Sequence, residues 1–201
     1  MHKKDIIIPG FSAYSIPGGD SMKFTRKQWH VTACLFTAAA GVLLHFTYDL
    51  TGNAVSALFG SVNESAWEHL KLAFWPAILM TVAEYMCYGY GEPSFIQSRC
   101  AGILTMLSIP LLLSPALVFL FGRRIVAADI LIFFLAVAAG FAVSYRLMQK
   151  KALLSPLWAA AAILILTALG LMFVCFTFAP PELSLFRDPI TKTYGIGKPS
   201  P

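Results

Sequence analysis

The chain has 201 residues, of which 58% are hydrophobic and 12% are charged, and its mean hydropathy is +0.71. A soluble domain carries roughly 25% charged residues, so this composition excludes a water-soluble globular domain. The formal net charge of +5 does not indicate nucleic-acid binding, because the basic residues lie beside apolar runs. The four cysteines form no C-x-x-C pair and are interpreted as small core or lipid-facing residues.

A polar amino-terminal arm precedes five apolar segments. Residues 1–28 are predicted to be a cytoplasmic arm, within which Met22 is an alternative start of the chain. The predicted spans are residues 29–50, 70–90, 100–121, 126–148 and 157–178, each long enough to cross a bilayer as a helix. Residues 179–201 are predicted to be an ordered extracytoplasmic tail. The sequence therefore predicts an all-α polytopic transmembrane helical bundle with about five spans.

Basic residues indicate the orientation of this bundle. Lys27, Arg99 and Arg146 lie at span ends that share one side, and the positive-inside rule makes that side cytoplasmic. The amino terminus is then inside and the carboxyl terminus outside. Arg123 and Arg124, in the short turn between the third and fourth spans, argue for the opposite orientation.

Ionisable residues gather around the junction of the first two spans. His45 and Asp49 are four residues apart near the end of the first span, so they share a helix face. Because ionisable groups at membrane depth are costly, they indicate a functional site by default. The candidate ligand-binding residues are His45, Asp49, Asn63, Glu64, Glu68, His69 and Lys71.

Several of these residues also have a structural interpretation. Ser65 and Glu68 have the spacing of a capping box, in which each side chain accepts from the other residue's amide. Glu64, Glu68 and Lys71 would then be a solvated first helical turn, and Trp67 an anchor at the membrane interface. On this interpretation the junction is a cap with ion pairs rather than a binding site.

Capping does not explain why two histidines face several carboxylates across a short connection. Neutral imidazoles with carboxylates are a ligand set suited to zinc or a similar divalent metal. The metal-ligand candidates are His45, Asp49, Glu64 and His69, which are expected to converge. No H-E-x-x-H motif is present, and His45 could instead donate to a backbone carbonyl. Five further residues could approach the same face: Arg123, Arg124, Asp129, Arg187 and Asp188.

Glu84 is a separate candidate within the membrane. It lies well inside the second span, about 20 Å from His69 by helical rise, so the two residues cannot share one small site. Its carboxyl group is expected to be protonated, paired with Arg146 or Arg99, or bonded to a tyrosine such as Tyr88. A structural pair is the favoured interpretation.

Three features of the sequence carry a resemblance to a family: the motif N-E-S-x-W-E-H-x-K at Asn63 to Lys71, the histidine in the first span, and the closing P-P…L-F-R-D-P…Y-G-I. On these features, the chain resembles an uncharacterised family of small multi-pass bacterial membrane proteins over about His30 to Ile196. The resemblance implies a protein of the bacterial cell membrane, and it implies no activity.

Two classes of function remain open at this point. The first is a polar extracytoplasmic site that binds a lipid or small ligand, with a metal-dependent hydrolase as its enzymatic form. The second is a transporter or channel component, or a structural partner of another membrane protein. No nucleophile with a positioned base favours an enzyme directly, and the sequence does not indicate an oligomeric state.

Overall fold

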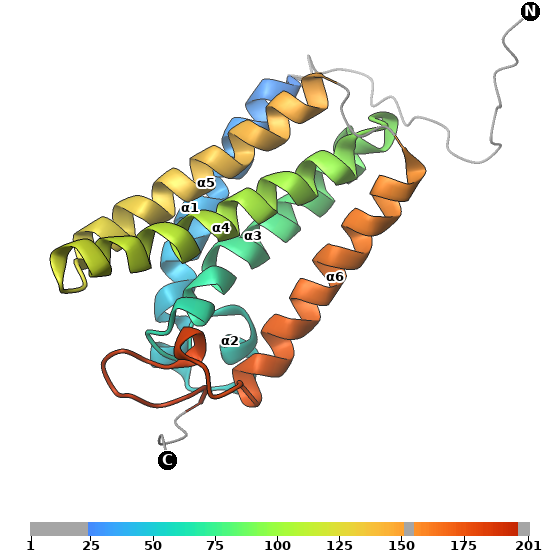
Figure 1. The fold of residues 1–201 in the computed structure, drawn as a ribbon. Coiled ribbons are helices and arrows are strands. Elements are labelled where there is room, and N and C mark those ends of the chain that lie inside the picture. The colour runs from blue at the N-terminus through green and yellow to red at the C-terminus, as the bar shows by residue number, and fades with distance from the viewer. Residues whose placement is uncertain (1–23, 151–154, 197–201) are drawn as a thin grey trace, which may run out of the picture.

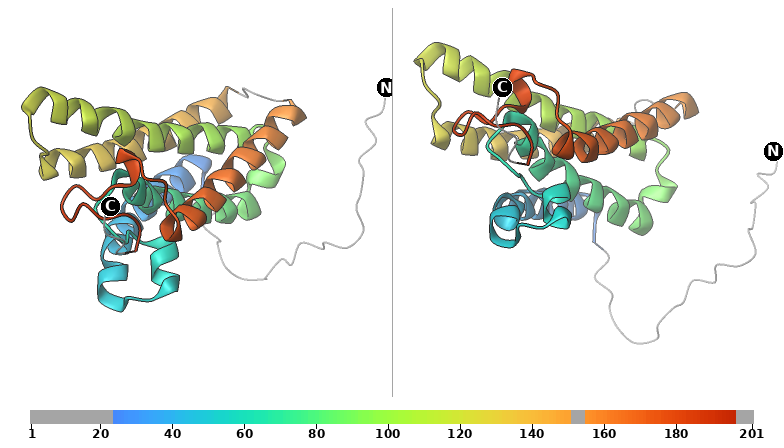
Figure 2. Two further views of the ribbon diagram at one scale, coloured as in Figure 1. Left: turned by 60° about the horizontal axis from the view of Figure 1, so that its bottom comes forward. Right: turned by 90° about the horizontal axis from the view of Figure 1, so that it is seen from below.

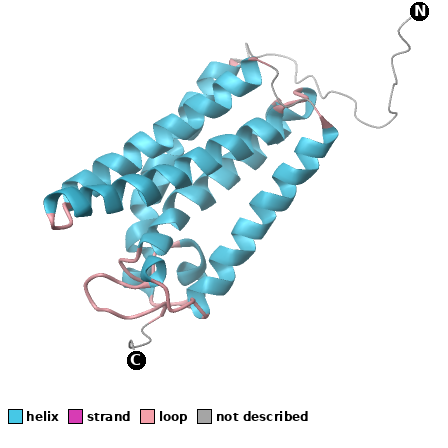
Figure 3. Cartoon of the chain, viewed as in Figure 1, coloured by secondary structure: helices cyan, strands magenta, loops and turns pink. Residues whose placement is uncertain are grey.

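The computed structural model describes residues 24–150 and 155–196 (Figure 1). The helices are α1 (Arg26–Thr51), α2 (Ala54–Phe59), α3 (Ala66–Cys87), α4 (Phe95–Phe121), α5 (Val126–Gln149) and α6 (Pro156–Phe178), with 3-10 turns η1 (Gly89–Gly91) and η2 (Ser184–Phe186). No strand occurs in these two ranges, only one isolated antiparallel bridge between Arg187 and Tyr194 (Figure 3). The predicted all-α class is confirmed. Most of the predicted arm, Met22, and the last five residues of the tail lie outside the described ranges.

Five of these helices, all except α2, are long and apolar enough to cross a membrane. The protein is therefore a multi-pass membrane protein, as the sequence predicts. The helices α3 and α4 begin several residues before the predicted spans, at Ala66 and Phe95. The difference arises because the predicted spans cover only the apolar runs. The first two turns of each helix also contain buried charged residues, Glu68 in α3 and Arg99 in α4.

The helix α3 is the most buried of the five spans, and α1, α4 and α6 pack against it. The helices α4 and α5 form an antiparallel hairpin that runs the length of the molecule (Figure 1). Phe74 of α3, Met106 of α4, Val137 of α5 and Phe173 of α6 meet in one apolar core. The two views in Figure 2 place α2 and the tail after α6 together at the end of the bundle where α1 ends and α3 begins.

A buried lysine connects three helices at that end. Lys71 of α3 is fully buried, and its Nζ donates to the Ala57 carbonyl of α2 at 2.8 Å and to the Thr177 hydroxyl of α6 at 2.9 Å. The Glu68 carboxylate lies 2.5 Å from the same nitrogen. All three protons of the ammonium group therefore have acceptors. The expectation that Glu68 and Lys71 belong to a solvated first turn is wrong, because both are enclosed by α2 and α6.

A second buried polar cluster lies at the opposite end of the bundle. Arg99 of α4 places Nη2 2.6 Å from the Glu84 carboxylate of α3, and both side chains are buried. His30 of α1 brings Nδ1 to 3.8 Å from the same carboxylate and to 3.2 Å from the Tyr88 hydroxyl. Among the partners expected for Glu84, the structure thus shows Arg99 in direct contact.

Glycine allows α4 and α5 to approach closely. A Cβ added at Gly140 would lie 2.6 Å from the Gly102 carbonyl oxygen, and one added at Gly102 would lie 2.5 Å from the Gly140 carbonyl oxygen. Both separations are shorter than van der Waals contact, so any larger residue would push the two backbones apart. The crossing of this hairpin is therefore fixed by two glycines.

Gly140→Ala should lower the free energy of unfolding by about 1–3 kcal/mol, because the added methyl overpacks a backbone contact. Gly170→Ala is the matched control, since a Cβ there meets only ring carbons at 3.7–3.8 Å. It should be neutral or slightly stabilising, as alanine favours a helix. Thermal unfolding of the two variants in the same detergent measures the difference, and equal melting temperatures would contradict the close approach.

Candidate metal centre

The connection between α1 and α3 folds back on itself and brings Glu64 between the two helices. Gly52 ends α1 with a positive φ of 61°, and the Asn53 side chain then accepts from the Ser56 amide at 2.9 Å to begin α2. After α2, Ser61 returns to α1, where its hydroxyl lies beside His45. Glu64 follows three residues later, immediately before the cap of α3 at Ser65.

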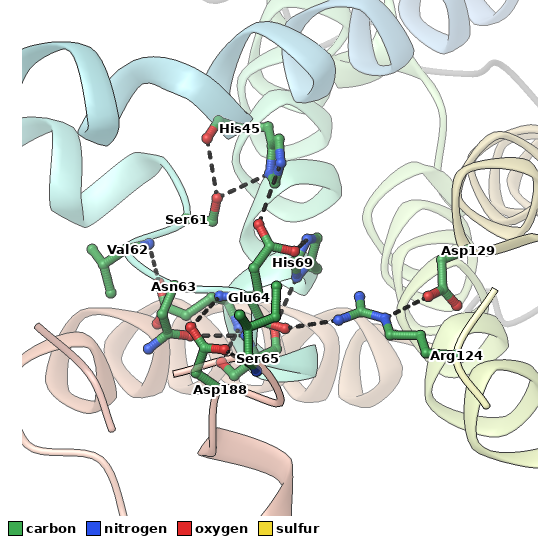
Figure 4. Close-up of polar contacts among 12 residues, drawn as sticks. His45, Ser61, Val62, Asn63, Glu64, Ser65, His69, Arg124, Asp129 and Asp188 are labelled. Atoms are coloured by element: carbon green, nitrogen blue, oxygen red, sulfur yellow. Dashed lines mark hydrogen bonds and ion pairs between the residues drawn. The ribbon is translucent and has the colours of Figure 1, made fainter. Parts of the chain in front are cut away.

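His45, Glu64 and His69 meet at this junction (Figure 4). One nitrogen from each ring and one carboxylate oxygen all lie within 4.8 Å of one another. Nε2 of His45 is 3.6 Å from Oε1 of Glu64, and Nε2 of His69 is 3.5 Å from Oε2. All three side chains are partly exposed, so the centre is open on one side.

The contacts of the two rings restrict which nitrogens carry hydrogen. Nδ1 of His69 lies 2.8 Å from the Ser65 carbonyl oxygen, which can only accept, so Nδ1 is the donor. The Ser61 hydroxyl lies 3.2 Å from the His45 carbonyl oxygen and 3.1 Å from Nδ1 of His45. When its one hydrogen goes to the carbonyl, Nδ1 of His45 is the donor, and when it goes to Nδ1, the tautomer is reversed. In neutral His69, Nε2 carries a lone pair, and this nitrogen lies 3.5 Å from the Glu64 carboxylate.

This arrangement is complete only with a cation between the three groups. A lone pair and a carboxylate that face each other repel unless a proton or a metal ion lies between them. The separations of 3.5 and 3.6 Å, each to a different oxygen of Glu64, are longer than the 2.7–3.2 Å of an N–H···O hydrogen bond. One atom from each of the three residues lies within 4.8 Å of the other two, and a tetrahedral zinc ion with ligands at about 2.05 Å would bring them to about 3.3 Å from one another. The donor set fits a divalent metal with two imidazoles and one carboxylate.

The backbone of Glu64 is fixed from two distant parts of the chain. Its amide donates to Oδ2 of Asp188 in the carboxyl-terminal tail at 3.2 Å. Its carbonyl accepts from Nη1 of Arg124 in the α4–α5 turn at 3.3 Å, and Nε of the same arginine donates to Asp129 at 2.7 Å (Figure 4). The one carboxylate of the centre is thus oriented by contacts outside the α1–α3 connection.

Asp188 also organises the tail around itself. Its Oδ1 accepts from the amides of Ile190 at 2.6 Å and Thr191 at 3.1 Å, and the side chain is buried. Burial acts to raise the pKa of Asp188, but the amides of Ile190, Thr191 and Glu64 favour the carboxylate, and together they lower the pKa below its ordinary value. The tail is held a second time by Asn63, whose Nδ2 donates to the Gly195 carbonyl at 3.0 Å.

The remaining residues expected at this site have other positions. Asp49 is exposed and does not join the group of His45, Glu64 and His69, because the connection meets α1 through Ser61 at His45, one helical turn before Asp49. The expectation that all four converge is therefore wrong for Asp49. Asn63 holds the tail, and Glu68 with Lys71 forms the buried pair described above.

The predicted capping box is formed only in part. Ser65 accepts from the Glu68 amide at 3.3 Å, but the Ser65 amide donates to Oδ1 of Asn63 at 2.8 Å, and the Glu68 carboxylate accepts instead from the Val62 amide at 3.1 Å. Trp67 is buried rather than interfacial. Its ring packs on Phe173 and Phe186 at centroid distances of 4.6 and 4.9 Å. The tail and α6 bury these groups, which local sequence does not indicate.

Ser61 was not expected at the site, and no pattern in the sequence marks it. Its role depends on the return of the chain to α1 after α2. Of the five residues expected to approach this face, the structure brings Arg124 and Asp188 to the backbone of Glu64 and Asp129 to Arg124. The other two, Arg123 and Arg187, are exposed and make no side-chain contact with the centre in the described part of the chain.

The model of a family of unknown function, DUF6512, matches residues 20–196. The chain belongs to this family. The match agrees with the expected membership of an uncharacterised family. The matched range contains His45, Glu64 and His69 and the tail residues that contact the centre. No curated protein and no solved structure matches the chain. An assignment of function to this DUF6512 protein therefore depends on the geometry of the site.

Asp188→Ala should lower the free energy of unfolding by about 1–3 kcal/mol, because the backbone amides of Glu64, Ile190 and Thr191 lose their acceptor. Glu182→Ala is the matched control, as Glu182 is an exposed carboxylate of the same tail. Proteolysis of the purified protein should cut the tail faster in the Asp188 variant only. Equal rates of cleavage in both variants would contradict the role of Asp188.

The lowered pKa gives this contribution a defined pH dependence. A carboxyl group whose pKa is depressed by folding stabilises the protein above its unfolded pKa of about 3.9, and the stabilisation is lost as the pH falls through the lower folded value. The wild type should therefore lose part of its advantage over Asp188→Ala below about pH 4. Melting temperatures measured between pH 7 and pH 3 test this convergence.

Proposed function

We propose that the protein is a metal-dependent membrane protein whose His45, Glu64 and His69 bind zinc or a similar divalent ion, and that this centre acts on a lipid or another small ligand as a hydrolase. The observation that supports the proposal is the meeting of two imidazole Nε2 atoms and one carboxylate, with one ligand atom from each residue within 4.8 Å of the others. Two histidines and one glutamate are a ligand set found in catalytic zinc sites.

The open side of the centre favours catalysis over a purely structural metal. Structural zinc is closed by four protein ligands, whereas catalytic zinc keeps a position for water or substrate. Only three ligand side chains meet in the described part of the chain, and each is about one third exposed. A metal bound there would polarise the carbonyl or phosphoryl oxygen of a ligand. Hydrogen bonds at Nδ1, to the Ser65 carbonyl for His69 and with the Ser61 hydroxyl for His45, keep both rings oriented, as hydrogen bonds at the second nitrogen of metal-ligating histidines do.

Purified protein should contain about one equivalent of zinc or a similar metal by elemental analysis, as expected of a single centre with three side-chain ligands. His45→Ala and His69→Ala should each remove it. Asp49→Ala is the matched control, because Asp49 is an exposed carboxylate four residues from His45 that lies outside the group. Metal content should also fall as the pH is lowered, since protons compete with the metal for imidazole.

A metal-free wild type that remains metal-free after incubation with zinc would contradict the proposal. Retention of a full equivalent in both histidine variants would contradict it as well. In either case the two histidines and Glu64 would be a protonated ion-pair cluster at the cap of α3.

The same proposal includes a location. We assign the protein to a bacterial cell membrane with the amino terminus in the cytoplasm and the metal centre on the outer side. The support is the distribution of basic residues, since Lys27, Arg99 and Arg146 lie at the end of the bundle opposite the centre. Arg124 is weaker evidence for the opposite orientation, because its guanidinium group donates to the Asp129 carboxylate and to the Glu64 carbonyl.

Single cysteines at Ala54 and Gly91, in a background without native cysteines, should react with an impermeant thiol reagent on opposite sides of the membrane. Both positions are exposed, and a Cβ at Gly91 meets nothing within 4 Å. Intact cells should label the Ala54 variant, and the Gly91 variant should label only after lysis. The reverse pattern would place the centre in the cytoplasm.

Transport, or a role as a channel component or structural partner, is the second candidate function. The buried Glu84 and Arg99 support it, together with nearby polar atoms that have no hydrogen-bond partner in the described residues, among them Nε2 of His30 and Oγ of Ser98 and Ser144. Such atoms often mark internal water or an ion. The elemental analysis separates the candidates, because a path through Glu84 requires no metal at the other end of the bundle.

A further inference from the structure

We propose that the ligand of this centre is a phosphate ester of an amphiphile, whose phosphate group is bound by Arg124 beside the metal while its apolar part stays in the bilayer. The inference rests on the proposed metal centre and names the chemical class of its ligand. Three features of the structure carry it: the arginine next to Glu64, the balance of charge at the centre and the apolar surface around His45.

Arg124 is held next to the centre with part of its guanidinium group unused. Nε is bonded to Asp129 and Nη1 to the Glu64 carbonyl, and the side chain is 35% exposed. A guanidinium has five N–H groups, so the two bonds leave the others directed away from these partners. Because Asp129 fixes the plane of the group, it is oriented before a ligand arrives. A fixed, partly exposed guanidinium beside a metal centre is suited to an anion.

The charges around the centre also favour an anion. With a divalent ion, the neutral histidines and the Glu64 carboxylate leave one positive charge. Arg124 and Asp129 balance each other, and the Asp188 carboxylate is 3% exposed and faces backbone amides. A phosphate ester presents several oxygens in different directions, so it can meet both a metal and an arginine fork. A carboxylate has only two oxygens, which lie in one plane.

The surface around His45 favours an amphiphile over a free phosphate ion. His45 lies six residues before the end of α1 at Thr51, which is about 9 Å along the helix axis. The ring of Phe46 contacts the His45 ring at a centroid distance of 4.9 Å and is 52% exposed. Leu50 on α1 and Val126 on α5 are exposed as well. Exposed apolar side chains of a predicted membrane span, Phe46 and Leu50, thus lie on the same helix as His45, where an apolar chain of a ligand could contact them.

The test uses the full-length zinc-loaded protein in maltoside micelles and three probes: hexyl phosphate, hexanoate and inorganic phosphate. Isothermal titration should give an affinity for hexyl phosphate at least about 10-fold above that for either other probe, because only hexyl phosphate combines the phosphate with an apolar chain. If inorganic phosphate binds as tightly as hexyl phosphate, the inference that the ligand is an amphiphile is contradicted. If hexanoate binds as tightly, the inference that the ligand is a phosphate ester is contradicted. If no probe gives heat, both parts of the inference are contradicted.

Arg124→Gln should weaken hexyl phosphate binding about 10-fold or more, and Arg124→Lys, which keeps the charge without the fork, should lose less. Arg123→Gln is the matched control, an exposed neighbour with no contact to the centre among the described residues. Zinc content is measured for every variant. Full zinc with unchanged hexyl phosphate binding in both Arg124 variants overturns this inference alone, whereas a wild type without zinc overturns the proposed function first.

Discussion

The fold at the end of the bundle near Glu64 depends on one buried cation, the ammonium group of Lys71. An ammonium group without acceptors in an apolar bundle is strongly unfavourable, so a buried Lys71 requires oxygen acceptors from the segments packed around it. Its three acceptors come from α2, α6 and the preceding turn of α3. Satisfying this one group therefore docks the short helix α2 and the end of α6 onto α3. Once α2 is docked, the chain returns past α1 at Ser61 and leads Glu64 to a position between the two histidines.

The centre and its supports are built from different parts of the sequence for a physical reason. The histidines are carried by long helices, whose packing in the core fixes their positions to within the freedom of a side chain. Glu64 is in a connection and has no such support. Its amide and carbonyl are instead held by Asp188 and Arg124, more than 50 residues away along the chain. The tail is thus part of the site's framework, although none of its side chains is among the three metal-ligand candidates.

The two polar ends of the bundle differ in a way that bears on function. At the end near Glu84, the charged groups pair within the apolar core, and several neighbouring polar atoms lack partners in the described residues. At the end near Glu64, the Nε2 atoms of His45 and His69 meet the Glu64 carboxylate on an open face, and among the buried side-chain atoms of the described residues there Nε1 of Trp67 lacks a hydrogen-bond partner. Polar groups that face one another and solvent are suited to binding a ligand. Polar groups without hydrogen-bond partners in an enclosed core are suited to binding internal water.

The sequence by itself determined the class of the protein, the approximate spans and the junction at which ionisable residues gather. These follow from hydrophobicity, which is a local property of each segment. It also named His45, Glu64 and His69 among its candidates, but it could not separate them from Asp49, Glu68 and Lys71. That separation depends on the path of the connection and on which groups α2, α6 and the tail cover. Only the tertiary structure decided it, because burial and contact between distant segments arise when the whole chain packs.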